Sequence, residues 1–442
     1  MIPILRAVLR YLLIAAALLA LAAGGAVAYK VLSDEDPPEK RGSATEEFVA
    51  TDTPEPPPAP ERKVIPEPWP TFGYDDQRTK VSPYEFRPPF RRTWRVDARD
   101  TIEFPPSAAY GNVYMAQQKG LFFALDGKTG KPVFKTKNFK RCAAASPTLA
   151  NGTIYQSYMD FVECGQGDPN PTGFVIAMDA KTGKQKWRYK GMPFESSPLL
   201  HDGILYVGSW DGNVHAIRAK TGRRVWTYQT GNRVNTSAAY SQGRIFIANQ
   251  DGTLFALNAR TGRLAWKASE ATEFFYAAPA VAYGRVFIGS SDGTMYAYGQ
   301  RTGKLLWAKS LGSYIYSSAA IYDKKVYAGS YDGRFYALDA ATGDVRWQRT
   351  MESAVHAPPV VMDGLVYAAT CATCGSAAAR SVKMGKDGTT AFTARTGRVR
   401  WKNNAGKYAS PIIADQDRVY LVGRSYLYAL EKPKKKKKRA AR

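Results

Sequence analysis

The stretch Ala216-Ile-Arg-Ala-Lys-Thr221-Gly-Arg-Arg-Val-Trp226 contains the pattern that decides the fold: an Ala, a Thr-Gly pair and a Trp at fixed distances. The Ala lies five residues before the Thr, and the Trp lies five residues after it except in the first copy, which has Phe134. The central copies are 39 to 41 residues apart. A period of ~40 residues in strand-like units predicts a β-propeller. The seven copies have their Thr at Thr129, Thr182, Thr221, Thr261, Thr302, Thr342 and Thr396.

One repeat can be divided into four short antiparallel strands, at residues 197–200, 204–209, 214–217 and 224–228. Gly203, Gly212 and Gly222 mark the turns between them, and Asp211-Gly212 is typical of a two-residue hairpin. Four such strands make one propeller blade. We expect the Trp of each outer strand to pack against the neighbouring blade, next to the small Ala. These docking residues are Trp94, Trp187, Trp226, Trp266, Trp307, Trp347 and Trp401.

The eighth blade lacks one strand at its own place in the sequence. After Trp401, strands are expected at residues 409–413, 418–422 and 426–430, and then the repeat stops. Residues 92–96 carry Trp94 without a Thr-Gly pair before it, so they can supply the missing outer strand. This pairing leaves no free sheet edge. We therefore predict an all-β fold: an eight-bladed propeller of four-stranded antiparallel blades, closed by an N-terminal strand.

These repeats resemble the PQQ-like propeller family, which includes quinoprotein dehydrogenases and the BamB-like propeller of the outer-membrane assembly machine. The resemblance extends from Trp69 to Glu431 and implies the propeller fold. For function it implies either a binding scaffold or a dehydrogenase with PQQ and Ca²⁺. The assembly family is lipidated, whereas no Cys precedes Cys142 here, so we expect no lipid-modified N-terminal Cys.

An apolar segment at residues 11–29 precedes the propeller and contains no charged side chain. Its length suits a single transmembrane helix. Arg6 and Arg10 lie before it, which predicts a cytoplasmic N-terminus at residues 1–10 and an extracytoplasmic propeller at residues 69–431. The alternative is a secretory signal cleaved near Ala28. Residues 30–68 are acidic and rich in Pro, so we expect a semi-rigid stalk.

The net charge of +24 is unevenly distributed. Residues 1–68 hold 7 basic and 10 acidic side chains, while the tail at residues 432–442 holds 8 basic and none acidic. We expect this tail to be disordered and to meet an anionic lipid or wall polymer. The basic propeller attracts anionic partners or simply keeps the protein soluble. A nucleic acid is not expected outside the cytoplasm.

Two long insertions, at residues 158–172 and 371–388, fall between the second and third strands of their blades and so share one face with the connections between blades. Aromatic and basic residues are frequent there, a composition typical of binding hot spots. These side chains either form a binding surface or fill the mouth of the central channel. The predicted face comprises Phe104, Arg141, Phe194, Trp210, Arg233, Phe275, Tyr276, Tyr314, Tyr316, Tyr331, His356 and Tyr408.

The four Cys predict two disulfides in an oxidising compartment, Cys142–Cys164 and Cys371–Cys374. Cys142 enters the second blade and Cys164 lies in the insertion of the same blade, so both reach one face. Cys371 and Cys374 lie together in the insertion of the seventh blade. A zinc site is the rival for this pair, but two further ligands are missing.

We expect a non-catalytic scaffold that binds a protein, peptide or envelope polymer. Only three His are present, and they are scattered, which disfavours a His-based metal or nucleophile–base site. No catalytic, cofactor or metal residues can be assigned. The alternatives are a PQQ-dependent dehydrogenase, and an extracytoplasmic sensor or cell-wall adhesin.

Overall fold

The computed structural model describes residues 69–159, 164, 171–274, 276–372, 387–403 and 412–433. The chain divides into two compact units, residues 1–41 and 42–442, and every described residue belongs to the second unit. The predicted anchor, the stalk and the tail beyond residue 433 lie outside the described residues. Within that described part of the chain, no helix is long and apolar enough to span a membrane.

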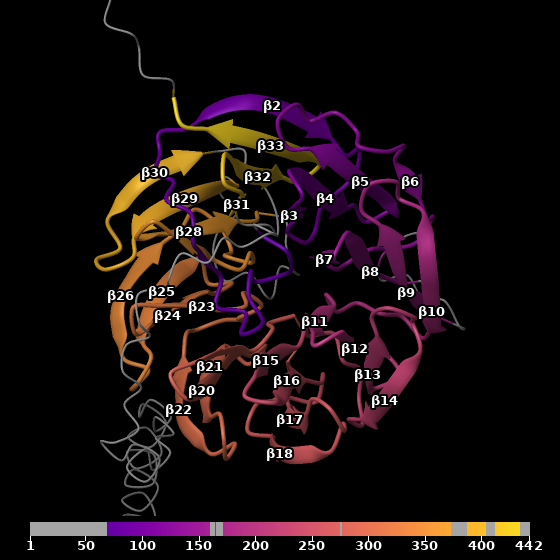
Figure 1. Cartoon of the computed structure of the whole chain (residues 1–442). Coiled ribbons are helices and arrows are strands. Elements are labelled where there is room, and N and C mark those ends of the chain that lie inside the picture. The colour runs from indigo at the N-terminus through magenta and orange to yellow at the C-terminus, as the bar shows by residue number, and fades with distance from the viewer. Residues whose placement is uncertain are drawn as a thin grey trace, which may run out of the picture. The chain divides into compact units, whose positions relative to one another are not determined.

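Eight antiparallel sheets of four strands each are arranged around a ring, and their inner strands lie toward its middle (Figure 1). The predicted eight-bladed propeller is thereby confirmed. Blades 1 to 4 consist of β3 Ser107–Ala109, β4 Asn112–Ala116, β5 Leu121–Asp126, β6 Lys137–Asn138; β7 Thr148–Ala150, β8 Thr153–Met159, β9 Gly173–Asp179, β10 Gln185–Gly191; β11 Leu199–His201, β12 Ile204–Gly208, β13 Asn213–Arg218, β14 Arg224–Gln229; β15 Ala239–Ser241, β16 Arg244–Ala248, β17 Leu254–Asn258 and β18 Leu264–Ala268.

The second half of the ring repeats this plan, with an additional parallel strand in blade 7. Blades 5 to 7 consist of β19 Ala280–Ala282, β20 Arg285–Gly289, β21 Thr294–Gly299, β22 Leu305–Ser310; β23 Ala320–Tyr322, β24 Lys325–Gly329, β25 Arg334–Asp339, β26 Val345–Thr350; β27 Val360–Met362, β28 Leu365–Thr370, β29 Gly388–Thr393 and β30 Val399–Asn403, with β1 Val81–Ser82 parallel to β27. Blade 8 consists of β31 Ile413–Ala414, β32 Val419–Gly423, β33 Tyr426–Glu431 and β2 Arg91–Asp97.

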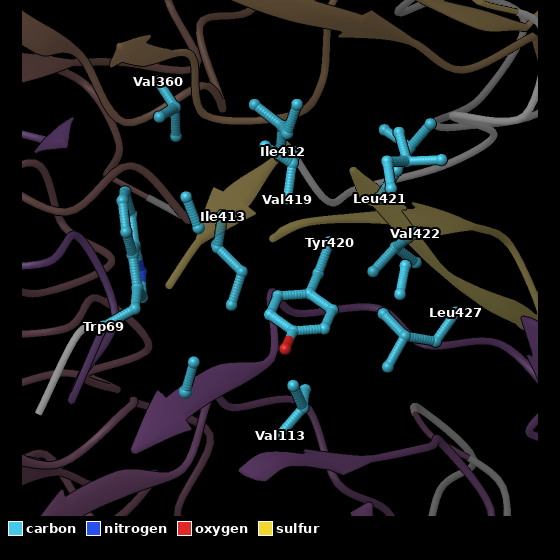
Figure 2. Close-up of a cluster of buried hydrophobic side chains, with 14 of the residues drawn as sticks. Trp69, Val113, Val360, Ile412, Ile413, Val419, Tyr420, Leu421, Val422 and Leu427 are labelled. Carbon is cyan, nitrogen blue, oxygen red and sulfur yellow. The ribbon is translucent and has the colours of Figure 1, made fainter. Parts of the chain in front are cut away.

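Closure of the ring follows the predicted strand exchange. β2 pairs antiparallel with β33, so that Trp94 lies opposite Ala429. Beside this joint lies a hydrophobic cluster in which Ile413, Tyr420 and Trp69 are almost fully buried (Figure 2). The N-terminal strand therefore completes the last blade, as the prediction requires.

The spacing between Ala and Trp in the repeat is a cross-strand register. Ala216 on β13 faces Trp226 on β14, and a bulge follows immediately. The same pair recurs in blades 2 to 8. Because Ala has only a methyl group, the indole can lie flat across the sheet and reach the next blade. The need for a small residue directly opposite the Trp thus explains the fixed spacing between Ala and Trp in the repeat.

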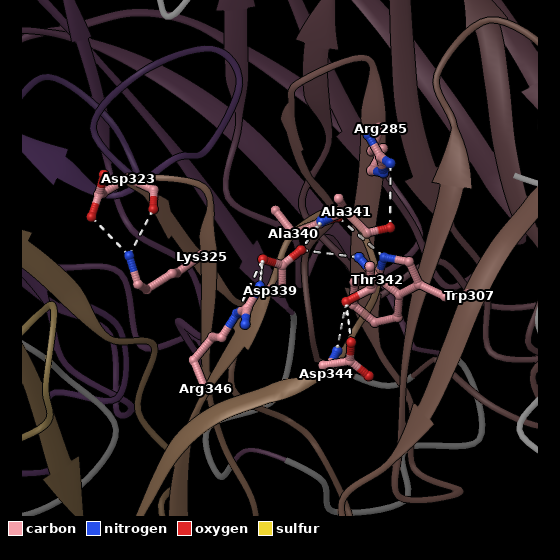
Figure 3. A network of polar contacts seen from close by, with 10 residues as sticks. All are labelled: Arg285, Trp307, Asp323, Lys325, Asp339, Ala340, Ala341, Thr342, Asp344 and Arg346. Carbon is pink, nitrogen blue, oxygen red and sulfur yellow. Dashed lines mark hydrogen bonds and ion pairs between the residues drawn. The ribbon is translucent and has the colours of Figure 1, made fainter. Parts of the chain in front are cut away.

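Six of the seven indoles then dock on the Thr-Gly turn of the following blade. Figure 3 shows Trp307 with its Nε1 donating to the Ala340 carbonyl, next to the turn at Thr342. Six of the Trp residues make this bond at 2.8 to 3.1 Å. The Gly of each turn lies directly on the ring, and a Cβ at Gly262 would come within 2.6 Å of Trp226. The turn therefore needs Gly both for its positive φ and for this close approach.

Blade 1 departs from the repeat at its outer strand. β6 is limited to Lys137–Asn138, and Phe134 lies in an irregular segment before it. Pro132 forms only an isolated bridge with Leu125. A proline has no backbone N–H to donate to a ladder, which explains why pairing stops here.

The ring has two chemically different faces. Turns between strands 1 and 2 bond to turns between strands 3 and 4, as from Ala219 N to Gly203 O at 2.9 Å, and this side is called the Thr-Gly face. On the other side, the hairpins between strands 2 and 3 bond to the connections between blades, as from Trp210 N to Pro193 O at 3.0 Å. This side is called the connection face.

The segment Trp69–Ser82, called the channel segment, runs along the inner edges of the blades, which the sequence did not predict. The inner strand of each blade is a sheet edge with unpaired backbone groups, and the segment satisfies many of them. Backbone bonds of 2.7 to 3.0 Å join it to Ala108, Leu149, Tyr240, Val281, Ile321 and Val361, which belong to six different blades.

Two cations of the channel segment are fully buried. Arg78 Nε donates to the Ala238 carbonyl at 2.9 Å, and Lys80 Nζ donates to the carbonyls of Arg78 and Ala319 at 2.9 and 3.0 Å. Both lie over the ring of Phe72. Burial lowers the pKa of Lys80 to about 7 and that of Arg78 to about 10. The segment is thus held by hydrogen bonds that its own charged side chains donate to backbone carbonyls. These bonds offset the unfavourable desolvation of the two cations.

The docking of Trp on Gly can be tested with matched Gly substitutions. We expect Gly262→Ala to lower the free energy of unfolding by about 3 kcal/mol, because the new methyl group overlaps Trp226 and the backbone has positive φ. Gly243 also has positive φ, but a Cβ there meets nothing within 4 Å. Gly243→Ala should therefore cost about 1 kcal/mol. Equal losses in chemical denaturation would contradict the docking role.

The buried ammonium of Lys80 predicts a pH dependence of stability. Its pKa is lower in the folded protein than the usual value of 10.5, so the unfolded chain binds more protons above pH 7. The destabilisation caused by burying the charged ammonium group is greatest below pH 7, and it decreases as the pH rises. From pH 7 to pH 9, wild-type protein should gain about 2 kcal/mol relative to Lys80→Met. Parallel stability curves for the two proteins would contradict the assignment.

Candidate functional site at the mouth of the central channel

A small pocket opens on the connection face, at the mouth of the central channel. Its wall combines aromatic rings, a carboxylate and an imidazole, and Phe72 brings in the channel segment from within. We call it the mouth pocket. Its lining comprises Phe72, Glu103, Phe104, Pro105, Tyr276, Tyr316, Ser318, His356 and Pro358.

Two carboxylates form the acidic side of this mouth. Burial raises the pKa of Glu195 to about 7, with an added contribution from the charge of Glu103. Trp210 Nε1 donates to Glu195 at 2.8 Å, and Tyr276 also hydrogen-bonds to it. Burial likewise raises the pKa of Glu103, which accepts a bond from Gln118 at 2.9 Å. At neutral pH the mouth therefore carries partial negative charge in a low-dielectric setting.

Next to these carboxylates lies a cluster of tyrosines around His356. Tyr316 packs on Tyr331 with centroids 5.0 Å apart, on Tyr314 at 5.5 Å and on Tyr276 at 5.7 Å. Tyr331 is buried and its hydroxyl hydrogen-bonds to His356 Nδ1. Burial lowers the pKa of His356 to about 4, so the imidazole is neutral at physiological pH. The cluster presents ring faces and hydroxyl groups rather than positive charge.

Arg233 and Trp210 form a neighbouring pair on the same face. The guanidinium of Arg233 stacks over the Trp210 ring at 4.5 Å, while the indole N–H is directed to Glu195. The pair links the exposed surface to the acidic side of the mouth. A partner that stacks here would meet an aromatic ring, a cation and a carboxylate together.

The remaining predicted face residues are placed in three ways. Phe104 lines the pocket and packs on Phe72 at 6.2 Å, whereas Arg141 lies half-buried on the connection into blade 2, outside the pocket lining. Phe194 is fully buried between blades 2 and 3, so its ring belongs to the core. Phe275 and Tyr408 lie outside the described residues.

The sequence reasoning missed Glu103 and Glu195 as mouth residues, although a signal was present. Each lies four residues before the inner strand of its blade, as do Tyr276, Tyr316 and His356. Asn235 occupies the same position in blade 4, where its buried Oδ1 has no hydrogen-bond partner among the described residues. The position four residues before the inner strand of each blade therefore identifies the side chains around the channel mouth.

A disulfide joins Cys142 to Cys164, with Cα atoms 5.2 Å apart, as predicted. It ties the insertion of blade 2 to the connection that enters the blade, on the connection face. Cys371 is also disulfide-bonded, while its predicted partner Cys374 lies outside the described residues. The bridge lies close to the mouth, because Phe104 and Trp210 pack against the cluster that contains Cys142.

Two kinds of curated relative are similar to parts of the chain. It is 30% identical over 161 residues to outer membrane protein assembly factor BamB of Burkholderia pseudomallei, covering 35% of this chain and 38% of that protein. It is 32% identical over 174 residues to 1-butanol dehydrogenase (cytochrome c) of Thauera butanivorans, covering 37% of this chain and 18% of the enzyme. The chain thus matches well under half the length of either, and neither kind is clearly nearer.

The solved structure of BamB from Moraxella catarrhalis shares the fold, with a TM-score of 0.60. Sequence identity is 14%, and the match covers 79% of this chain and 100% of that chain. At this identity the likeness concerns the architecture alone.

The mouth residues do not fit the calcium–quinone centre that a dehydrogenase would require. Ca²⁺ takes six to eight oxygen ligands. No group of three or more His, Cys, Asp or Glu side chains suited to a metal occurs within the described part of the chain. PQQ is itself a tricarboxylate, and at the mouth it would face the carboxylates of Glu103 and Glu195.

A family model also matches the sequence of this propeller. The family model described as "Outer membrane protein assembly factor BamB" matches residues 91–238 and 211–440, which is most of the propeller. The chain therefore belongs to this family of PQQ-like propellers.

Proposed function

We propose that this protein is a non-catalytic binding scaffold outside the cytoplasm, which holds a protein or peptide partner at the mouth pocket. The observation that carries the proposal is the mouth pocket itself, where tyrosine rings lie next to two carboxylates and Phe72 of the channel segment lines the wall. Residues 11–29 would tether the scaffold to a membrane, and residues 30–68 would act as its stalk. Its BamB-like relatives, named for outer-membrane protein assembly, support the scaffold class.

The chemistry of the mouth favours a partner that inserts a cationic side chain. A Lys or Arg side chain can lie against the faces of Tyr276 and Tyr316, where the ring quadrupole attracts its charge. Glu103 and Glu195 add charge-assisted acceptors. Because the pKa of Glu195 is raised to about 7, binding should strengthen as the pH rises through the neutral range and this carboxyl ionises.

The rigidity of the site supports recognition rather than a reaction. The Tyr331–His356 bond and the Trp210–Glu195 bond fix the rings before a partner arrives. The disulfide fixes Cys142, on the connection into blade 2, to Cys164. Preorganised aromatic anchors lower the ordering cost of association.

A site-specific photo-crosslinker at Tyr316 should capture a partner in intact cells that express the full chain. The same crosslinker at Tyr110, an exposed residue on the Thr-Gly face, is the matched control and should not yield this product. Adding Glu195→Gln should reduce the Tyr316 product several-fold. Identical products from both positions would contradict binding at the mouth.

The dehydrogenase alternative has a separate readout. Purified protein supplied with PQQ and Ca²⁺ should reduce no dye on addition of a primary alcohol. Alcohol-dependent dye reduction that disappears in Glu195→Gln would contradict the scaffold and favour the enzyme. If the Tyr316 crosslinker captures no partner and the protein also oxidises no alcohol, the scaffold proposal is contradicted and the dehydrogenase gains no support.

A further inference from the structure

The Thr-Gly face carries a ring of positive charge that the mouth pocket does not use. In six of the seven repeats the Thr-Gly pair has a Lys or Arg immediately before and immediately after it, which places twelve cations on this face. All twelve side chains are exposed. The exception is the turn at Thr342, where Ala341 and Asp344 take these positions.

Equivalent positions in the blades of a propeller lie at one height on the ring. The twelve cations therefore share a common level, in contrast with the connection face, where hairpins carry Asp211, Asp251, Asp292 and Asp332. Acidic side chains also lie on the Thr-Gly face, at Asp126, Asp179 and Asp339 beside the Thr-Gly pairs, but Lys and Arg outnumber them at these turns. A level array brings many charges within one Debye length of a flat surface at the same time, about 8 Å at physiological salt.

Apolar side chains occur on the same side. The large hydrophobic residues that are exposed in the described part of the chain are Tyr110, Val225, Leu264, Val345 and Val399. Tyr110 lies in the turn between β3 and β4, and the other four follow a Thr-Gly pair by two or three residues. Cations beside exposed apolar side chains are typical of surfaces that lie on the interface of a bilayer.

The C-terminal end of the propeller points to the same face. β33 runs from the hairpin at Gly423–Tyr426 to Glu431, where Arg91 pairs with it at 3.5 Å. Strand 3 of each blade ends on the Thr-Gly face, so the chain leaves the propeller there. The sequence after Pro433 holds seven further Lys and Arg residues.

We propose that the Thr-Gly face docks on the surface of an anionic phospholipid bilayer, with the mouth pocket facing away from it. The level ring of cations matches a plane of phosphate headgroups, and the exposed apolar side chains match the region just beneath them. The inference concerns the face opposite the proposed partner site and does not depend on that site.

Orientation at a membrane can be measured by energy transfer with the full chain reconstituted in vesicles. One fluorophore is attached through Thr342→Cys on the Thr-Gly face and another, in a separate protein, through Asp251→Cys on the connection face. The acceptor is a labelled lipid headgroup. With about 30% phosphatidylglycerol in phosphatidylcholine, transfer should be much stronger from the Thr-Gly label. Raising salt from about 50 mM to about 500 mM should abolish the difference.

Matched charge variants test which cations are responsible. Lys184→Gln, Arg223→Gln and Arg263→Gln together remove three cations from the Thr-Gly face. Each Lys or Arg close to an anionic surface strengthens binding about fivefold, so the ratio of docked to undocked protein should fall by at least about tenfold. Lys119→Gln, Lys140→Gln and Lys190→Gln remove the same charge from the connection side and should change little. The C-terminal tail is identical in both variants.

Several outcomes would overturn the proposal. Equal transfer from the two labels, or the same transfer in pure phosphatidylcholine, would exclude docking by charge through this face. Equal loss in both triple variants would show that net charge alone matters. If the protein binds soluble polyglutamate, and the two labels show equal energy transfer at the anionic bilayer, the cations serve to bind a polymer instead.

Discussion

The contact between an outer-strand Trp and the Thr-Gly turn of the next blade, which six of the seven Trp make, is the interaction on which the whole propeller depends. The indole N–H donates a hydrogen bond to a backbone carbonyl, and a Gly lies directly on the indole ring, as for Trp307 and Gly343. The Ala opposite the Trp gives the ring its place within the sheet. Because the contact always joins one blade to its successor, it sets both the stacking of blades and the need for closure. Blade 8 has no Thr-Gly turn, and there Trp401 packs instead on Phe90 at 5.4 Å.

The channel segment turns this ring into a molecule with a site. Inner strands would otherwise leave polar edges around the axis, and the segment pairs with six of them. Its two buried cations lie over Phe72, whose ring contributes to the wall of the mouth pocket. The same residues that close the channel therefore shape the pocket above it. This arrangement retains a buried ammonium group at some cost in stability at neutral pH.

The two faces of the ring have separate chemistry because they are built from different parts of the repeat. The connection face receives the segments between blades and the insertions, which vary from one repeat to the next and carry Glu195, Tyr316 and His356. The Thr-Gly face receives the most regular part of the repeat, and its charges recur for that reason. A propeller of this family supports several functions, so the function must be argued from these faces rather than from the fold.

The sequence by itself determined the blade count, the closure by the strand at Trp94 and the bridge between Cys142 and Cys164, because each follows from the repeat period and strand order. It did not reveal the channel segment or the burial of Phe194. Contacts within and between neighbouring repeats recur every ~40 residues and are visible as a pattern. Trp69–Ser82 has no repeat of its own and bonds through its backbone to strands far away in sequence. Only the tertiary structure, by bringing those edges around one axis, decides where such a segment lies and which side chains line the mouth.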